Sequence, residues 1–153
     1  LVPPSLFSFN RIARRIKLNE GFRQRVYKDQ LGNKTIGYGH LIIPKESFSL
    51  KKKYSKKALL EIFYIDLKKA ILDFKKYFDY NNFSDNEQEI IIEMIFQLGI
   101  EKVLQFKKFF YCIKQKQPYL ASLQMIKSKW YQQTPKRVNK LIAILLKYNV
   151  GQK

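Results

Sequence analysis

The sequence predicts an α+β fold in which a small sheet-containing lobe is joined by a long helix to a larger helical lobe. Strand-forming residues surround a Gly-Asn turn within residues 20–55, so a two- or three-stranded antiparallel sheet is expected there. A long apolar stripe at helical spacing follows in residues 55–79, and residues 80–150 also show helical spacing. At 153 residues the chain is expected to form one domain, 1–153.

A first helix is predicted at residues 9–20, because Ile12 and Ile16 share one apolar stripe and Gly21 provides a C-terminal stop. Glu20 occupies the next position on that stripe. It meets the negative end of the helix dipole, where a cation would be preferred. A residue placed against local preference is a candidate for function.

The predicted hairpin has a short strand before a turn at residues 30–33 and a returning strand at residues 34–39. Closing this hairpin brings Asp29 and Thr35 near one another, facing the end of the first helix. Gly39 permits close approach of the backbone to a ligand or a packed helix. The first 45 residues contain nine Lys and Arg but only two carboxylates, Glu20 and Asp29, so these two acids are the candidates for chemistry.

The connecting helix at residues 55–79 is expected to begin with Ser55 as its N-cap. In the larger lobe, residues 84–87 match a capping box that opens a mostly apolar helix. We expect this lobe to pack with the N-terminal helix. Its predicted helices cover residues 85–97, 106–116, 119–128 and 135–147.

Composition restricts the function classes. Thirty Lys and Arg against twelve carboxylates give a net charge of +18, which favours polyanionic partners. Cys112 is the only cysteine and His40 the only histidine, which excludes an internal disulfide and most His-based metal sites. No metal, no cofactor and no transmembrane segment are expected. The first residue is Leu1 rather than Met, which is compatible with removal of a start codon, signal or anchor.

Three separated motifs carry a resemblance to a known family. The pattern Glu20, eight residues, Asp29, five residues, Thr35 resembles the catalytic signature of the phage-type lysozymes, the T-even bacteriophage muramidases. The resemblance covers residues from about 9 to about 147, and it is specific because the separate motifs occur in the same order as in the family. The further matching motifs are Thr35 to Leu41, Phe96 to Gly99 and Lys127 to Arg137. The resemblance implies a mostly helical, two-lobed lysozyme-like fold.

The family cleaves the β-1,4 bond between N-acetylmuramic acid and N-acetylglucosamine in peptidoglycan, with inversion at the anomeric carbon. The resemblance implies that Glu20 is the general acid, Asp29 the base or water-orienting carboxylate, and Thr35 the second ligand of that water. Glycosidic hydrolysis needs one carboxyl group that protonates the leaving oxygen and one that stays ionised. Glu20, at the end of an apolar stripe, suits the protonated form. The alternative is that both acids are surface groups paired with nearby arginines.

Supporting and substrate-binding residues follow from the same resemblance. His40 is expected to form a salt bridge with Asp66 of the long helix, the alternative being a solvent-facing Asp66. Arg137 aligns with a family arginine that pairs with the catalytic glutamate. Phe109 stands where the family has a small polar residue, and a helix-spaced Phe is more often a core residue. The implied substrate contacts are Leu41, Phe96, Gln97, Phe109 and Gln124.

The expected partner is peptidoglycan, with anionic envelope polymers as a second partner, and the chain is expected to act as a monomer. We expect a bacteriolytic enzyme made in the host cytoplasm that acts on the wall in the periplasm or outside the cell. The cationic surface predicts adhesion to this envelope; a rival interpretation is membrane disruption by residues 136–147. Other rivals are a lytic transglycosylase, a wall-binding protein without hydrolysis, and a nucleic-acid-binding protein, for which no base-reading motif is present and no specific nucleic acid is expected.

Overall fold

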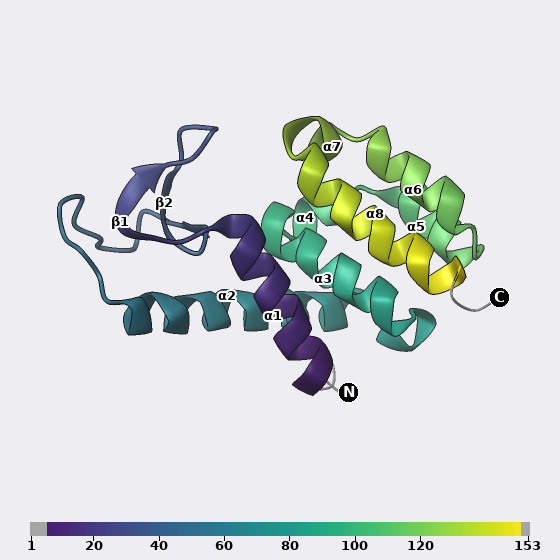
Figure 1. Ribbon diagram of the computed structural model, residues 1–153, viewed down its shortest axis with the longest axis horizontal. Helices are drawn as coiled ribbons and strands as arrows, with labels where there is room; N and C mark the ends of the chain where they lie inside the picture. Colours follow the sequence, from purple (N-terminus) through teal and green to yellow (C-terminus); the bar gives the residue numbers. More distant parts are fainter. Residues whose placement is uncertain (1–5, 151–153) are drawn as a thin grey trace. The chain divides into compact units, whose positions relative to one another are not determined.

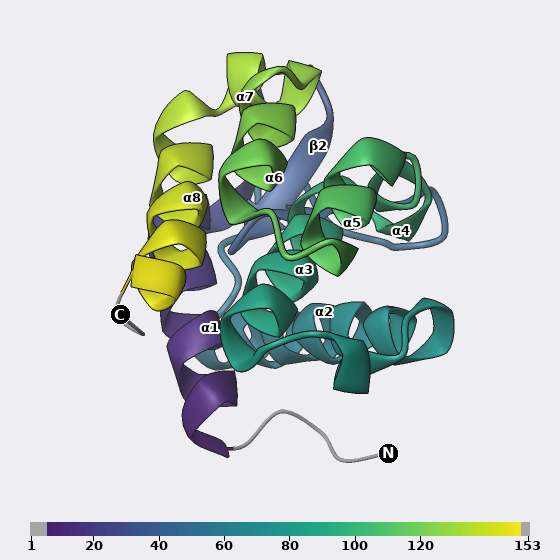
Figure 2. The same cartoon turned by 90° about the vertical axis from the view of Figure 1, so that its right-hand side faces the viewer.

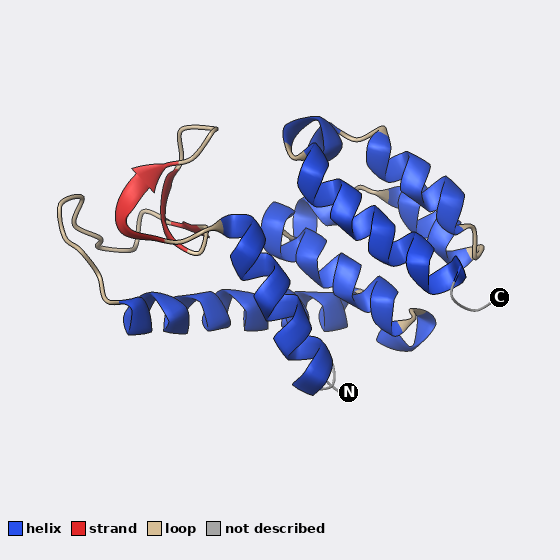
Figure 3. Cartoon of the chain, viewed as in Figure 1, coloured by secondary structure: helices blue, strands red, loops and turns tan. Residues whose placement is uncertain are grey.

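The computed structural model describes residues 6–150 of the protein (Figure 1). The chain divides into two compact units, Ser5–Ile71 and a second that begins at Leu72. The predicted α+β class is confirmed: a small antiparallel sheet lies near the N-terminus and the remainder is helical (Figure 3). The described elements of the first unit, with the long helix that leaves it, are α1 Leu6–Glu20, β1 Arg23–Lys28, β2 Lys34–Gly37, β3 His40–Leu41 and α2 Lys56–Tyr77.

Helix α1 ends where the sequence predicts, although it begins before residue 9. Gly21 adopts a left-handed conformation with φ of 71°, and its N–H donates to the carbonyl of Lys17 at 3.1 Å. Ile12 and Ile16 are fully buried, as their stripe predicts. Glu20 is therefore fixed as the last helical residue, directly before the turn into the sheet.

The sheet has the strand order β1-β2-β3, with both neighbouring pairs antiparallel. Tyr27 pairs with Thr35 and Lys28 with Lys34, which confirms the predicted hairpin. The predicted second strand, 34–39, is too long. It ends at Gly37 because Gly37 and Gly39 both have positive φ, 66° and 74°, which turns the chain into the short strand β3.

The sheet packs on the first part of helix α2. The ring of Tyr38 lies 4.7 Å from that of Phe22 and 5.4 Å from that of Phe63 on α2. The predicted N-cap is confirmed, because the Ser55 hydroxyl accepts the N–H of Ala58 at 3.1 Å. Helix α2 runs across the division between the two units at residues 71 and 72.

The second unit is entirely helical in its described part. The Ser84–Glu87 capping box is present in both directions, as predicted, and opens α3, whose apolar residues from Ile90 to Ile95 are buried. Three short elements, η1, α4 and α7, were not predicted, since three to five residues are too few for a periodic pattern. The elements are η1 Tyr80–Asn82, α3 Asp85–Leu98, α4 Ile100–Val103, α5 Lys107–Lys114, α6 Pro118–Ile126, α7 Lys129–Gln133 and α8 Pro135–Val150.

In the second unit α6 packs against both α5 and α8 (Figure 2). The expected packing of the N-terminal helix with the helical lobe stays a prediction, as does the single domain 1–153. None of the described helices is long and apolar enough to cross a membrane.

Candidate active site

Glu20 lies against the backbone of the β2–β3 turn. A Cβ atom built on Gly39 would overlap the Oε2 and Cδ atoms of the Glu20 carboxyl group. Glu20 itself is half-buried at the end of α1. Two local features therefore favour glycine at position 39: the φ of 74°, and the Glu20 carboxyl group, which occupies the space that a side chain would need.

Asp29 organises the hairpin turn. Its Oδ1 accepts the N–H of Leu31 at 2.9 Å and that of Asn33 at 2.8 Å, while Oδ2 has only a 3.5 Å contact with the Asn33 amide nitrogen. Such side-chain-to-backbone bonds are the usual reason for Asp in turns. Asp29 thus has a structural role that sequence spacing did not reveal, and this role leaves Oδ2 with spare accepting capacity.

Thr35 lies on β2, next to the turn that Asp29 holds. Its side chain is 4% exposed, and its hydroxyl donates to the carbonyl of Asn33 at 3.0 Å. A hydroxyl that donates once keeps lone pairs for accepting. The strand therefore presents an acceptor, in a sheltered position, close to the Asp29 turn.

Tyr27 lies within electrostatic reach of both acids. Burial raises the pKa of the Tyr27 phenol, and the negative charges of Glu20 and Asp29 raise it further, against a lowering by the guanidinium of Arg23. That guanidinium lies 4.6 Å from the centre of the tyrosine ring. The charges of Glu20 and Asp29 therefore both reach the phenol of Tyr27. Sequence reasoning missed Tyr27, although its position opposite Thr35 in the hairpin register could have indicated it.

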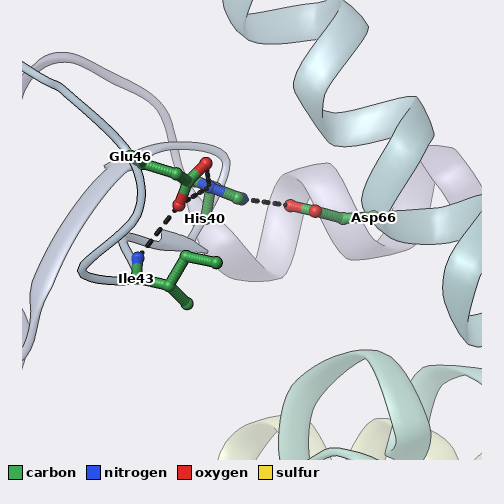
Figure 4. A network of polar contacts seen from close by, with 4 residues as sticks. All are labelled: His40, Ile43, Glu46 and Asp66. Atoms are coloured by element: carbon green, nitrogen blue, oxygen red, sulfur yellow. Dashed lines mark hydrogen bonds and ion pairs between the residues drawn. The ribbon is translucent and has the colours of Figure 1, made fainter.

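His40 is held between two carboxylates (Figure 4). Its Nδ1 lies 2.7 Å from Oδ2 of Asp66, which confirms the predicted contact, and its Nε2 lies 2.8 Å from Oε2 of Glu46. The hydrogen bond with Asp66 raises the pKa of His40 to about 9, against burial, and Glu46 adds to the rise. With a carboxylate at each ring nitrogen, both nitrogens donate only when the ring is protonated.

Glu46 also fixes the loop that follows β3. Its Oε1 accepts the N–H of Ile43 at 2.9 Å. Burial raises the pKa of Glu46, but the Ile43 N–H and the His40 contacts outweigh burial, so the pKa is lowered overall. Sequence reasoning did not identify Glu46, because a carboxylate six residues after a histidine in a loop shows no periodicity that would indicate the contact.

Arg137 and Glu93 form a buried ion pair in the second unit. The Nε of Arg137 lies 3.4 Å from Oε2 of Glu93, and the two side chains are 8% and 0% exposed. Glu93 was not predicted, since α3 looked like an apolar helix. The expected pairing of Arg137 with the catalytic glutamate stays a prediction.

Two comparisons with known proteins identify the family of the chain. Residues 17–147 match the family model described as "Phage lysozyme". The chain belongs to the phage lysozyme family. A relative from Dictyostelium discoideum, "Probable T4-type lysozyme 2", is 30% identical over 84% of this chain and 89% of its own length. A second from the same organism, "Probable T4-type lysozyme 1", is 31% identical over 85% of this chain and 90% of its own length.

Membership of the phage lysozyme family makes the chain a lysozyme-type glycoside hydrolase of peptidoglycan, which acts on the cell wall. Within the described residues, no group of three or more His, Cys, Asp and Glu side chains could hold a metal ion. The carboxyl groups of Glu20 and Asp29 and the hydroxyl of Thr35 can perform acid–base chemistry supported by hydrogen bonds.

The residues that the phage lysozyme resemblance implied as substrate contacts differ in their surroundings. Leu41 on β3 is 51% exposed, while Phe96 and Gln124 are half-buried. Gln97 uses both ends of its amide: Nε2 donates to the Thr134 hydroxyl at 3.1 Å, and Oε1 accepts the indole N–H of Trp130 at 2.8 Å. These bonds tie α3 to α7, which gives Gln97 a structural role.

Phe109 is 1% exposed and its ring lies 5.1 Å from that of Phe110. This burial favours the core alternative weighed for Phe109 and speaks against direct contact with a sugar. The contacts to sugar at Leu41, Phe96, Gln97 and Gln124 stay predictions.

Proposed function

We propose that the protein is an endo-acting N-acetylmuramidase. It cleaves the β-1,4 bond between N-acetylmuramic acid and N-acetylglucosamine with inversion, using Glu20 as general acid and Asp29 with Thr35 to orient the attacking water. The observation that supports the proposal is that the negative charges of Glu20, at a helix end, and Asp29, at a hairpin turn, both act on the phenol of Tyr27. Two such acids would satisfy the need of glycoside hydrolysis for a proton donor and a water-activating carboxylate.

Glu20 is the better donor of the proton. It is half-buried and in contact with the Gly39 backbone, so its carboxyl group is placed by the fold before substrate arrives. A general acid that is positioned in this way contributes typically about 100-fold to 10,000-fold in rate. The Tyr27 ring, under the Arg23 guanidinium, would shield the space between the acids from bulk water.

Asp29 suits the second role because only one of its oxygens is fully used by the turn. Oδ1 anchors the carboxylate through two backbone N–H groups, which leaves Oδ2 to accept a proton from water. The buried hydroxyl of Thr35 would accept the other hydrogen of that water, since its own hydrogen is donated to Asn33. Two acceptors would then direct one water molecule.

In this account the protein is a bacteriolytic enzyme whose cleavage of wall glycan leads to cytolysis, whether released as an endolysin or used in defence against bacteria. It would act as a monomer in the periplasm or outside the cell. Anionic envelope polymers would bind the cationic surface without being cleaved.

The test compares wall clearing by the wild type, Glu20→Gln and Asp29→Asn. Glu20→Gln removes the acid, and we expect a loss of about 100-fold or more. Asp29→Asn keeps an Oδ1 acceptor for the turn but replaces Oδ2, so it separates chemistry from folding. The control is Glu61→Gln, an exposed acid on α2. Full activity in either folded site variant would disprove the assigned roles.

A further inference from the structure

Helix α6 exposes apolar side chains on the face that a surface helix normally fills with polar groups. The nine residues of Pro118–Ile126 include no charged side chain. At roughly 100° per residue, four exposed positions fall on one face, opposite the buried Ala121 and Met125. The exposed residues of this apolar face are Tyr119 at 63%, Leu120 at 51%, Leu123 at 41% and Ile126 at 44%. An exposed apolar patch on a charged protein usually marks an interaction site.

The surroundings of α6 define the charge of its partner. Lysines stand on both sides of the helix in the chain, and all four are exposed: Lys114, Lys116, Lys127 and Lys129. All twelve Asp and Glu of the protein lie before Lys102, so α5 to α8 contain no carboxylate that could offset these cations. The neighbouring helix α8 adds the exposed Lys136 and Lys140. The partner must therefore be anionic as well as able to cover apolar side chains.

We propose that α6 docks on an anionic lipid bilayer, with its apolar face among the acyl chains and its flanking lysines at the lipid phosphates. An amphipathic helix in the plane of a membrane shows this combination of an apolar face and cationic flanks. Tyrosine favours the boundary between headgroups and acyl chains, where Tyr119 would lie. Lysine stems reach along apolar surface while the ammonium group stays in the headgroup layer.

Two other partners explain less of the surface. A wall polymer would pair with the lysines, but it would leave Leu120, Leu123 and Ile126 in water. A second copy of the chain would cover the apolar face, but it would bring like charges together around it. The lipid surface accounts for both features. The site belongs to the unit that begins at Leu72, whereas Glu20, Asp29 and Thr35 belong to Ser5–Ile71, so docking is a function separate from hydrolysis.

The experiment is flotation of the full-length protein with vesicles of neutral phosphatidylcholine, alone or with about one third phosphatidylglycerol. We expect binding to the anionic vesicles and little to the neutral ones. The apolar-face variant carries Leu120→Ser and Leu123→Ser. Its partition into anionic vesicles should fall by roughly tenfold or more, because the buried acyl contacts are lost. Its matched control is Ile65→Ser with Leu72→Ser, which removes two exposed apolar residues from α2 and should bind within about twofold of the wild type.

Two variants of equal net charge test whether the lysines that flank α6 matter more for vesicle binding than the net charge of the protein. Each replaces four exposed lysines by Gln and lowers the net charge from +18 to +14, since 18 − 4 = 14. One removes the flanking lysines of α6, and its binding should fall by about tenfold. The other removes four lysines of the unit Ser5–Ile71 and should lose much less. The two sets are Lys114, Lys116, Lys127 and Lys129, and Lys51, Lys53, Lys56 and Lys57.

A fluorescence measurement gives the depth of the helix independently. Trp130 is the only tryptophan and is 3% exposed, so Tyr119→Trp adds an exposed reporter on α6. Its emission should shift to the blue on anionic vesicles and be quenched by brominated acyl chains. The proposal is overturned if this signal stays unchanged, if the apolar-face variant binds vesicles like its control, or if that variant instead loses only retention on purified walls or self-association.

Discussion

At the residue scale, the contact between Glu20 and Gly39 connects the helix end to the sheet. Gly39 has φ of 74° and no side chain, and both properties are used: the backbone turns from β2 into β3, and the Glu20 carboxyl group fills the open space. His40, the next residue, is fixed on both ring nitrogens. The turn under Glu20 is therefore held by the strand that follows it.

Gly39→Ala should inactivate the enzyme while leaving it folded. The new methyl group would push the Glu20 carboxyl group away, and misplacement by about 1 Å can cost about 100-fold in rate. The left-handed backbone adds a stability cost of about 1–2 kcal/mol. The measurement is activity on walls together with thermal unfolding.

The control for this substitution is Gly99→Ala. Gly99 has a similar φ of 85°, but a Cβ atom there would meet nothing within 4 Å. It should show the same kind of stability loss with nearly full activity. Equal loss of activity in both variants would mean that backbone strain, and not displacement of Glu20, is responsible.

The sequence identified Glu20, Asp29, Thr35, His40 and Asp66 as residues that the fold places in one unit. It did not identify Tyr27, Glu46 or Glu93. A motif is recognised by the spacing of its residues along the chain. Tyr27 instead acts through the hairpin register, Glu46 through a loop that returns to a strand, and Glu93 through burial on a helix that looked apolar. The second role of Asp29, as the anchor of the turn, also depends on backbone N–H groups that carry no sequence signature.

At the element scale, the His40 contacts join β3, the loop after it and helix α2 (Figure 4). The long helices were predictable because the hydrophobic periodicity and the capping residues of each helix lie within one continuous segment of the sequence. The end of β2 was not, since it is set by two positive-φ glycines rather than by a change in strand propensity. The three-way contact adds to the packing of Tyr38 on Phe63 in holding this short sheet to the helix.

The contribution of this contact to stability should depend on pH. The folded-state pKa of His40 is about 9, above its ordinary value of 6.5, so its stabilisation is fully present below about pH 6.5 and is lost as pH rises through about 9. The lowered pKa of Glu46 means that its stabilisation is present above about 4.5 and is lost as pH falls through its lower folded-state value. The contact is therefore strongest between about pH 5 and 6.5.

Asp66→Asn should cost about 1.5–3 kcal/mol of unfolding free energy near pH 6, the usual loss for a hydrogen bond to a charged group. The cost should be much smaller near pH 10, where the ring is neutral. Urea unfolding at both pH values measures the difference, with Glu61→Gln on the same helix as control. A cost that is the same at both pH values would show that the ion pair is not the source.

At the scale of the whole molecule, charge is distributed unevenly along the chain. All carboxylates lie in residues 1–101, and the remaining 52 residues are cationic or neutral. Exposed charges act over a screening length of about 8 Å at physiological ionic strength, and over less as salt increases. The charge is thus expected to affect how the enzyme reaches an anionic envelope more than how the proposed catalytic residues contact sugar.

Adsorption to intact walls should weaken steeply with salt, by about tenfold or more between low and high ionic strength. Cleavage of a short soluble muropeptide should weaken much less. Replacing Lys51, Lys52 and Lys53 with Glu should lower wall activity at low salt and spare the soluble substrate, whereas replacing the same three with Arg should change neither. Equal salt sensitivity on both substrates would place the effect at the active site and refute steering by surface charge.

Product analysis of a soluble peptidoglycan glycan cleaved by the wild type tests inverting hydrolysis by Glu20, Asp29 and Thr35 directly. Mass spectrometry should find N-acetylmuramic acid at the new reducing end, with one water added for each bond cleaved. NMR recorded during cleavage should show the α anomer first, since inversion of a β bond delivers water to the opposite face. A 1,6-anhydro product would instead identify a lytic transglycosylase, and an initial β anomer would contradict the roles of Asp29 and Thr35.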